Sequence, residues 1–170
     1  MEIATDIFST LDRADKTAVY RFLREQTPLL LADERDELAN SANLAALIFH
    51  ALPEINWAGF YWFKQGELVL GAFQGKPACV RIRLGRGVCG TAAEQRRTLV
   101  VADVHEFPGH IACDAASNSE IVVPLIKNNC LLGVLDVDSP LANRFNEQDK
   151  IELESIVAIF LESTDFLTLG

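Results

Sequence analysis

Three of the four cysteines have neighbours that suit thiol chemistry. Cys113 lies in a loop of small residues that leaves its side chain accessible, and a reactive thiolate needs that access. Cys89 begins a short predicted helix, where backbone N–H groups could lower the pKa of its thiol. Cys79 precedes a predicted strand, whereas Cys130 begins an apolar strand and is interpreted as structural. Because spacing does not show which sulfur atoms meet, redox chemistry and ordinary small apolar side chains both stay open here.

Acidic and aromatic residues form a second group with chemical potential. Asp136 and Asp138 are two residues apart on a predicted strand, so they project from one face. Glu120 begins the partner strand of that hairpin, so three carboxylates could converge at one end of the sheet and raise one another's pKa. The alternative is that each is simply solvated. Trp57 and Tyr61 share a face of another strand and could line a pocket.

Two other patterns imitate binding motifs. Gly85-Arg-Gly-Val-Cys-Gly90 matches the dinucleotide fingerprint, but a long loop and antiparallel strands follow it instead of a parallel βαβ unit. We expect these glycines to serve positive φ angles and close packing. His105, His110 and Cys113 lie within nine residues, yet the chain has no C-x-x-C pair with zinc-like spacing. No metal ligand is therefore assigned.

The composition limits the classes of partner. The 170 residues carry 15 basic and 24 acidic side chains, a formal net charge of −9, and 49% are hydrophobic. We expect one domain over residues 1–170 with a substantial core, and no nucleic-acid partner because the acidic excess repels phosphates. No apolar run approaches a membrane span, so no membrane partner is expected. The N-terminus lacks signal-peptide features, which favours a cytoplasmic protein with reduced thiols.

The predicted elements place these residues on one sheet. Helical spacing predicts two helices near the N-terminus and one near the C-terminus that Asn146 caps. Between them we expect a short helix at 87–94, an irregular segment at 103–119, and strands at 55–63, 67–73, 80–84, 98–101, 120–126 and 130–138. The two N-terminal helices are predicted at 17–31 and 33–52. The fold class is therefore α+β, a mostly antiparallel sheet with the N- and C-terminal helices packed on one face.

Five segments together resemble the free methionine-(R)-sulfoxide reductases, which are single GAF domains. They span nearly the whole chain, and three cysteines within them make the resemblance specific. The segments are Ile55-Asn-Trp-Ala-Gly-Phe-Tyr61, Phe73-Gln-Gly-Lys-Pro-Ala-Cys-Val-Arg-Ile82, Gly85-Arg-Gly-Val-Cys-Gly-Thr-Ala92, Gly109-His-Ile-Ala-Cys-Asp-Ala-Ala-Ser-Asn-Ser-Glu120 and Gly133-Val-Leu-Asp-Val-Asp-Ser139.

The resemblance implies reduction of free L-methionine-R-sulfoxide, with electrons returned by thioredoxin and no metal or organic cofactor. In such chemistry a thiolate attacks the sulfoxide sulfur and becomes a sulfenic acid, which a second cysteine converts to a disulfide. By resemblance Cys113 is the nucleophile and Cys79 its resolving partner. Cys89 is then either a second resolver or a competing nucleophile. Whether the protein acts as a single chain or a homodimer stays open.

The same resemblance implies roles for the second group. Trp57 and Tyr61 would pack on the methyl-sulfur end of the substrate. The three acids would polarise the sulfoxide oxygen or hold the ammonium group; they are Glu120, Asp136 and Asp138. The competing hypothesis is a non-catalytic GAF module that binds a small molecule and regulates a partner, although an acid-lined pocket would repel a phosphate-bearing ligand.

Overall fold

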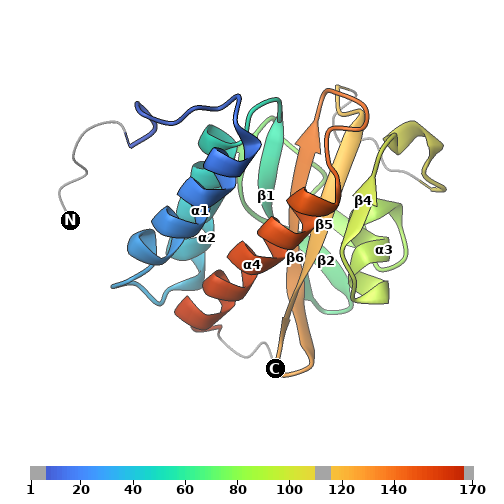
Figure 1. Cartoon of the computed structure of the whole chain (residues 1–170). Helices are drawn as coiled ribbons and strands as arrows, with labels where there is room; N and C mark the ends of the chain where they lie inside the picture. Colours follow the sequence, from blue (N-terminus) through green and yellow to red (C-terminus); the bar gives the residue numbers. More distant parts are fainter. Residues whose placement is uncertain (1–6, 110–115, 167–170) are drawn as a thin grey trace.

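The central sheet is antiparallel and separates two layers of helices (Figure 1). The computed structural model describes residues 7–109 and 116–166. In this part of the chain six strands follow the order β3-β2-β1-β6-β5-β4, and every neighbouring pair is antiparallel. The α+β prediction is confirmed. The strands are β1 (Trp57–Lys64), β2 (Glu67–Gly75), β3 (Arg81–Arg83), β4 (Leu99–Val101), β5 (Ser119–Lys127) and β6 (Cys130–Ser139).

Three helices cover one face of this sheet. They are α1 (Lys16–Leu30), α2 (Glu37–Ala51) and α4 (Glu147–Ser163), as predicted for helices from the two ends of the chain. Figure 1 shows α3 (Gly87–Gln95) on the other side, where the single turn η1 (Val104–Glu106) also packs. Among the described residues, no helix has the length and apolar character needed to span a bilayer.

Helix caps explain where two of these helices begin. Asn146 caps α4 through a capping box with Asp149, which confirms the predicted start. The second helix begins four residues later than its predicted start at residue 33, because the Asp36 carboxylate accepts from the Ala39 N–H and fixes the first turn there.

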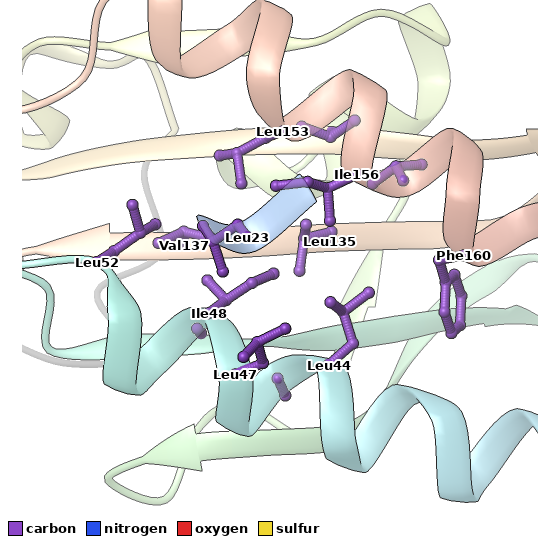
Figure 2. Packing of buried hydrophobic residues seen from close by; sticks show 14 of the residues in the cluster. Leu23, Leu44, Leu47, Ile48, Leu52, Leu135, Val137, Leu153, Ile156 and Phe160 are labelled. Carbon is purple, nitrogen blue, oxygen red and sulfur yellow. The ribbon is translucent and has the colours of Figure 1, made fainter. Parts of the chain in front are cut away.

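Strand alternation sorts the side chains between the two faces. On β6, Leu135 and Val137 enter the large core with α2 and α4, where they meet Ile48, Leu153 and their neighbours (Figure 2). The positions between them therefore point to the α3 face. The same alternation directs Phe60 and Trp62 of β1 into the large core and turns Trp57 and Tyr61 toward α3. The sheet thus packs one face against the helices α1, α2 and α4, and its other face carries Asp136 and Asp138 of the pocket.

Candidate active site

A pocket opens on the α3 face, where the ends of three strands meet one helix. Its walls include both predicted aromatic residues, all three predicted acids and one cysteine, namely Trp57, Tyr61, Glu120, Asp136, Asp138 and Cys89. Strand register explains the convergence, because Asp138 lies opposite Trp57 on one side and opposite Glu120 on the other. Residues separated by up to 81 positions in sequence therefore share one site.

The aromatic residues form a fixed apolar wall. Trp57 stacks on Tyr61 with ring centroids 5.9 Å apart and on Phe73 at 5.3 Å. Its indole Nε1–H donates to the Lys76 carbonyl oxygen at 3.1 Å, which fixes the ring plane. Burial and the nearby Asp136 charge raise the pKa of Tyr61, so its hydroxyl stays neutral. This wall suits a small apolar group such as a methyl-sulfur end.

Two of the acids are deeply buried beside each other. Glu120 is 7% exposed and Asp136 is 6% exposed. Burial, followed by the Asp136 charge, raises the pKa of Glu120 well above its usual range. Burial also raises the pKa of Asp136 to about 6, against the lowering effect of hydrogen bonds with Cys89 and Glu120. The raised pKa values favour a proton that is kept within the carboxyl pair.

The third wall is the Cys89 thiol, which is 4% exposed. Its Sγ lies 3.6 Å from Oε1 of Glu120, to which the thiol donates. Burial, followed by the charges of Asp136 and Glu120, raises the pKa of Cys89 well above its usual value. The sequence-based expectation that the helix would lower this pKa is wrong, because desolvation and two neighbouring acids oppose the helix N–H groups. Cys89 is held as a neutral thiol.

The remaining cysteines differ in state and position. Cys79 is disulfide-bonded, and both Cys89 and Cys130 carry free thiols. Cys130 is exposed at the turn between β5 and β6, so the predicted structural role does not correspond to burial in the core. Cys113 lies outside the described residues.

The rejected zinc pattern contains two histidines, His105 and His110. His105 lies in η1, and its Nε2 lies 3.0 Å from Oδ1 of Asn118. His110 lies outside the described residues. His105 is not among the described residues that line the pocket.

The glycine-rich segment serves the backbone, as expected. Gly85 and Gly87 have φ angles of +72° and +61°, which favour glycine. A Cβ on Gly90 would come within 2.3 Å of the Arg83 carbonyl oxygen, so only glycine lets α3 approach β3 this closely. This close approach brings Cys89 next to Glu120 of β5.

Two basic residues of the pocket were missed in the sequence. Lys76 and Arg86 also line it. Each was adjacent to a feature already singled out, since Lys76 precedes Cys79 by three residues and Arg86 lies inside the glycine-rich segment. Both residues are exposed, and Lys76 also accepts the Trp57 indole hydrogen bond through its backbone carbonyl.

Comparison with known proteins gives consistent matches. The family model described as GAF domain matches residues 39–160. The chain is 50% identical over 155 residues to the free methionine-R-sulfoxide reductase of Escherichia coli, covering 89% of this chain and 94% of that one. It is also similar to a solved free methionine-R-sulfoxide reductase from Neisseria meningitidis in complex with its substrate, at 45% identity and a TM-score of 0.85, covering 88% and 90% of the two chains. A third match is the substrate complex of Staphylococcus aureus fRMsr, with 53% identity, a TM-score of 0.82, and 85% and 94% coverage.

Proposed function

Because the chain belongs to the free methionine-R-sulfoxide reductase family of GAF domains, we propose that it reduces free L-methionine-R-sulfoxide to methionine. The observation that carries the proposal is the pocket itself. It combines a stacked apolar wall at Trp57 with a buried carboxyl pair that holds a proton at neutral pH. A sulfoxide needs both features, since its sulfur bears apolar carbon groups and its oxygen must accept a proton or hydrogen bond before it can be transferred.

The proposed substrate pose follows from these walls. The methyl-sulfur end packs on Trp57 and Tyr61, and the sulfoxide oxygen faces the protonated Glu120. The substrate ammonium faces Asp136 and Asp138. Support for this last contact comes from Asp136, whose Oδ1 is buried and lacks a hydrogen-bond partner. A buried carboxylate oxygen without a donor is costly, so a bound ammonium group would stabilise it.

The proposed chemistry begins at Cys113. Its thiolate attacks the sulfoxide sulfur while Glu120 gives its proton to the sulfoxide oxygen. That oxygen is transferred to Cys113, which becomes a sulfenic acid, and methionine leaves. The Cys79 thiol then displaces that oxygen as water and forms a disulfide with Cys113. The disulfide-bonded state of Cys79 supports its role as resolving partner. The buried neutral thiol of Cys89 argues against Cys89 as the first nucleophile, because the thiolate is the attacking form.

A dithiol reductant must complete the cycle. We propose that thioredoxin supplies the two electrons, reducing the Cys79 disulfide back to two thiols in the cytoplasm. The exchange step needs access to one sulfur of the disulfide. Cys79 is only partly buried at the end of the loop that follows β2, which is compatible with such access.

A single-turnover experiment tests the proposal. Fully reduced protein is mixed with excess L-methionine-R-sulfoxide or with the S epimer in the absence of any reductant, and methionine and free thiols are counted. We expect about one methionine per chain and the loss of two thiols with the R epimer alone. The Cys130→Ser variant is the matched control and should behave identically. Binding without methionine formation or thiol loss would instead indicate the regulatory GAF module.

A further inference from the structure

Three potential metal ligands from different elements meet in the pocket. The Cys89 Sγ of α3 and one carboxylate oxygen each from Glu120 of β5 and Asp136 of β6 all lie within 4.8 Å of one another. All three residues are buried. Sequence spacing could not reveal this group, because its members are separated by 31 and 16 positions.

The spacing of two of these atoms already fits a tetrahedral metal. Zinc binds thiolate sulfur at about 2.3 Å and carboxylate oxygen at about 2.1 Å, so a tetrahedral angle separates the two ligand atoms by about 3.6 Å. The Sγ of Cys89 lies 3.6 Å from Oε1 of Glu120. These two ligands therefore need little movement to bind one ion together.

The third ligand carries an independent sign of a missing positive partner. Oδ1 of Asp136 is buried in the pocket wall and has no hydrogen-bond partner. Buried carboxylate oxygens are normally satisfied by donors or cations. Within the described residues, no ion pair joins Asp136 to a basic side chain.

We propose that Cys89, Glu120 and Asp136 form a binding site for one divalent zinc-like cation, with a fourth coordination position open to the pocket. Binding replaces the thiol proton of Cys89 and the carboxyl proton of Glu120, and both protons are released to solvent. The mixed sulfur and oxygen set suits Zn²⁺ and Cd²⁺ better than Mg²⁺ or Ca²⁺, which prefer oxygen alone. On the proposed function, the ion occupies the place of the substrate ammonium and sulfoxide oxygen, so it acts as a competitive inhibitor and not as a cofactor.

The state of the cysteines gives this site a distinctive property. Cys89 is a free thiol while Cys79 is disulfide-bonded. The site therefore persists in the oxidised protein, whereas a metal bound through Cys79 would be lost on oxidation. This difference separates the proposed site from adventitious binding to the redox cysteines.

The test is a Cd²⁺ titration of the full chain with the Cys79 disulfide intact, followed by the ultraviolet charge-transfer absorbance of a cadmium-thiolate bond. We expect one equivalent of Cd²⁺ to bind with a signal that is lost in Cys89→Ser and retained in Cys130→Ser. Asp136→Asn and Glu120→Gln keep the thiol but remove ligands, and each should weaken binding at least about tenfold. A signal that survives Cys89→Ser, or that is equally strong in Asp136→Asn, would overturn the proposal.

A kinetic arm separates this inference from the proposed function. With reduced protein, Zn²⁺ should raise the apparent KM for L-methionine-R-sulfoxide without changing kcat, and a chelator should reverse the effect. Sulfoxide reduction with a KM that is insensitive to zinc would contradict the metal site while leaving the function intact. A cadmium site without any sulfoxide reduction would contradict the function while leaving the metal site intact.

Discussion

Two buried carboxyl groups on opposite faces of the sheet are satisfied in opposite ways. On the helical face, Asp149 is fully buried and each of its oxygens accepts two hydrogen bonds or ion pairs. Oδ2 accepts from Lys16 Nζ at 2.5 Å and from the Asn146 N–H at 2.7 Å. Oδ1 accepts from the Tyr20 hydroxyl at 2.7 Å and from Arg144 at 3.3 Å. This charge is neutralised entirely by the protein.

On the α3 face, Asp136 is almost as buried but is neutralised only in part. Its neighbours are another acid and a thiol, Glu120 and Cys89, and its Oδ1 lacks a donor. Two aspartates that are similarly buried therefore have different roles. Complete pairing stabilises the fold at Asp149, whereas incomplete pairing at Asp136 costs stability and leaves a site that a ligand can complete.

The largest expected effect concerns the proposed thiol chemistry. Cys113→Ser should abolish methionine formation even in a single turnover, because a hydroxyl is a far weaker nucleophile than a thiolate at neutral pH. The measurement is methionine released per chain from the R epimer. Activity in Cys113→Ser together with an inactive Cys89→Ser would move the nucleophile to Cys89.

The next prediction concerns the free energy of unfolding and the buried ion pairs on the helical face. Asp149→Ala should lower the free energy of unfolding by about 3 to 5 kcal/mol, because it leaves the partly buried charges of Lys16 and Arg144 without their partner. Urea denaturation of the reduced protein measures this loss. The folded variant should keep the wild-type kcat, since Asp149 is not among the residues that line the pocket. A loss below about 1 kcal/mol would show that this pairing contributes little.

Discrimination between substrates tests whether a ligand completes the acidic site. N-acetylation and amidation of the substrate remove the ammonium charge and leave a buried carboxylate without its partner. We expect kcat/KM for the N-acetyl amide of L-methionine-R-sulfoxide to fall roughly hundredfold below that of the free amino acid. Asp136→Asn and Asp138→Asn should reduce this ratio. Equal rates on the two substrates in the wild type would contradict ammonium recognition by these acids.

The smallest effect is a gain in stability that depends on pH. The pKa of Asp136 is raised to about 6 in the folded protein by burial, so the folded state favours the protonated form. Its contribution to stability is therefore fully present below the unfolded pKa of about 4 and is lost as the pH rises through about 6. Asp136→Asn cannot ionise, so relative to wild type it should gain up to about 3 kcal/mol at pH 8.

Urea denaturation at pH 4 and pH 8 checks this sign. The gain from Asp136→Asn should be present at pH 8 and largely absent at pH 4. Asp149→Asn serves as the matched control on the other face, where removal of the charge breaks existing pairs and should destabilise the protein at pH 8. A stabilising Asp149→Asn would contradict the contrast between the two carboxylates.

Sequence patterns predicted most of the fold because they report local geometry. Strand alternation predicted that Asp136 and Asp138 share a face, and the side-chain chemistry of Asn146 predicted the start of α4. The pKa of Cys89 could not be predicted in this way. Its direction depends on burial depth and on acids from two strands that are distant in sequence, whereas the helix start alone suggested the opposite direction.

Two basic residues of the pocket lining could not be predicted either, because their position also depends on tertiary packing. Lys76 and Arg86 line the pocket because β2 pairs with β1 and α3 packs against the sheet, which are tertiary relationships. The roles of Cys79 and Cys113 rest on the family resemblance and on chemistry, not on spacing. Those roles therefore call for the most direct experiment.

That experiment is a peptide map of the disulfide formed by one equivalent of L-methionine-R-sulfoxide. Fully reduced protein is treated, alkylated at acidic pH to trap free thiols, digested and analysed by mass spectrometry. We predict a single new crosslink between Cys79 and Cys113, with Cys89 and Cys130 alkylated as free thiols. A crosslink that contains Cys89 as the main product, or methionine formation with all four cysteines alkylated, would contradict the proposed thiol chemistry.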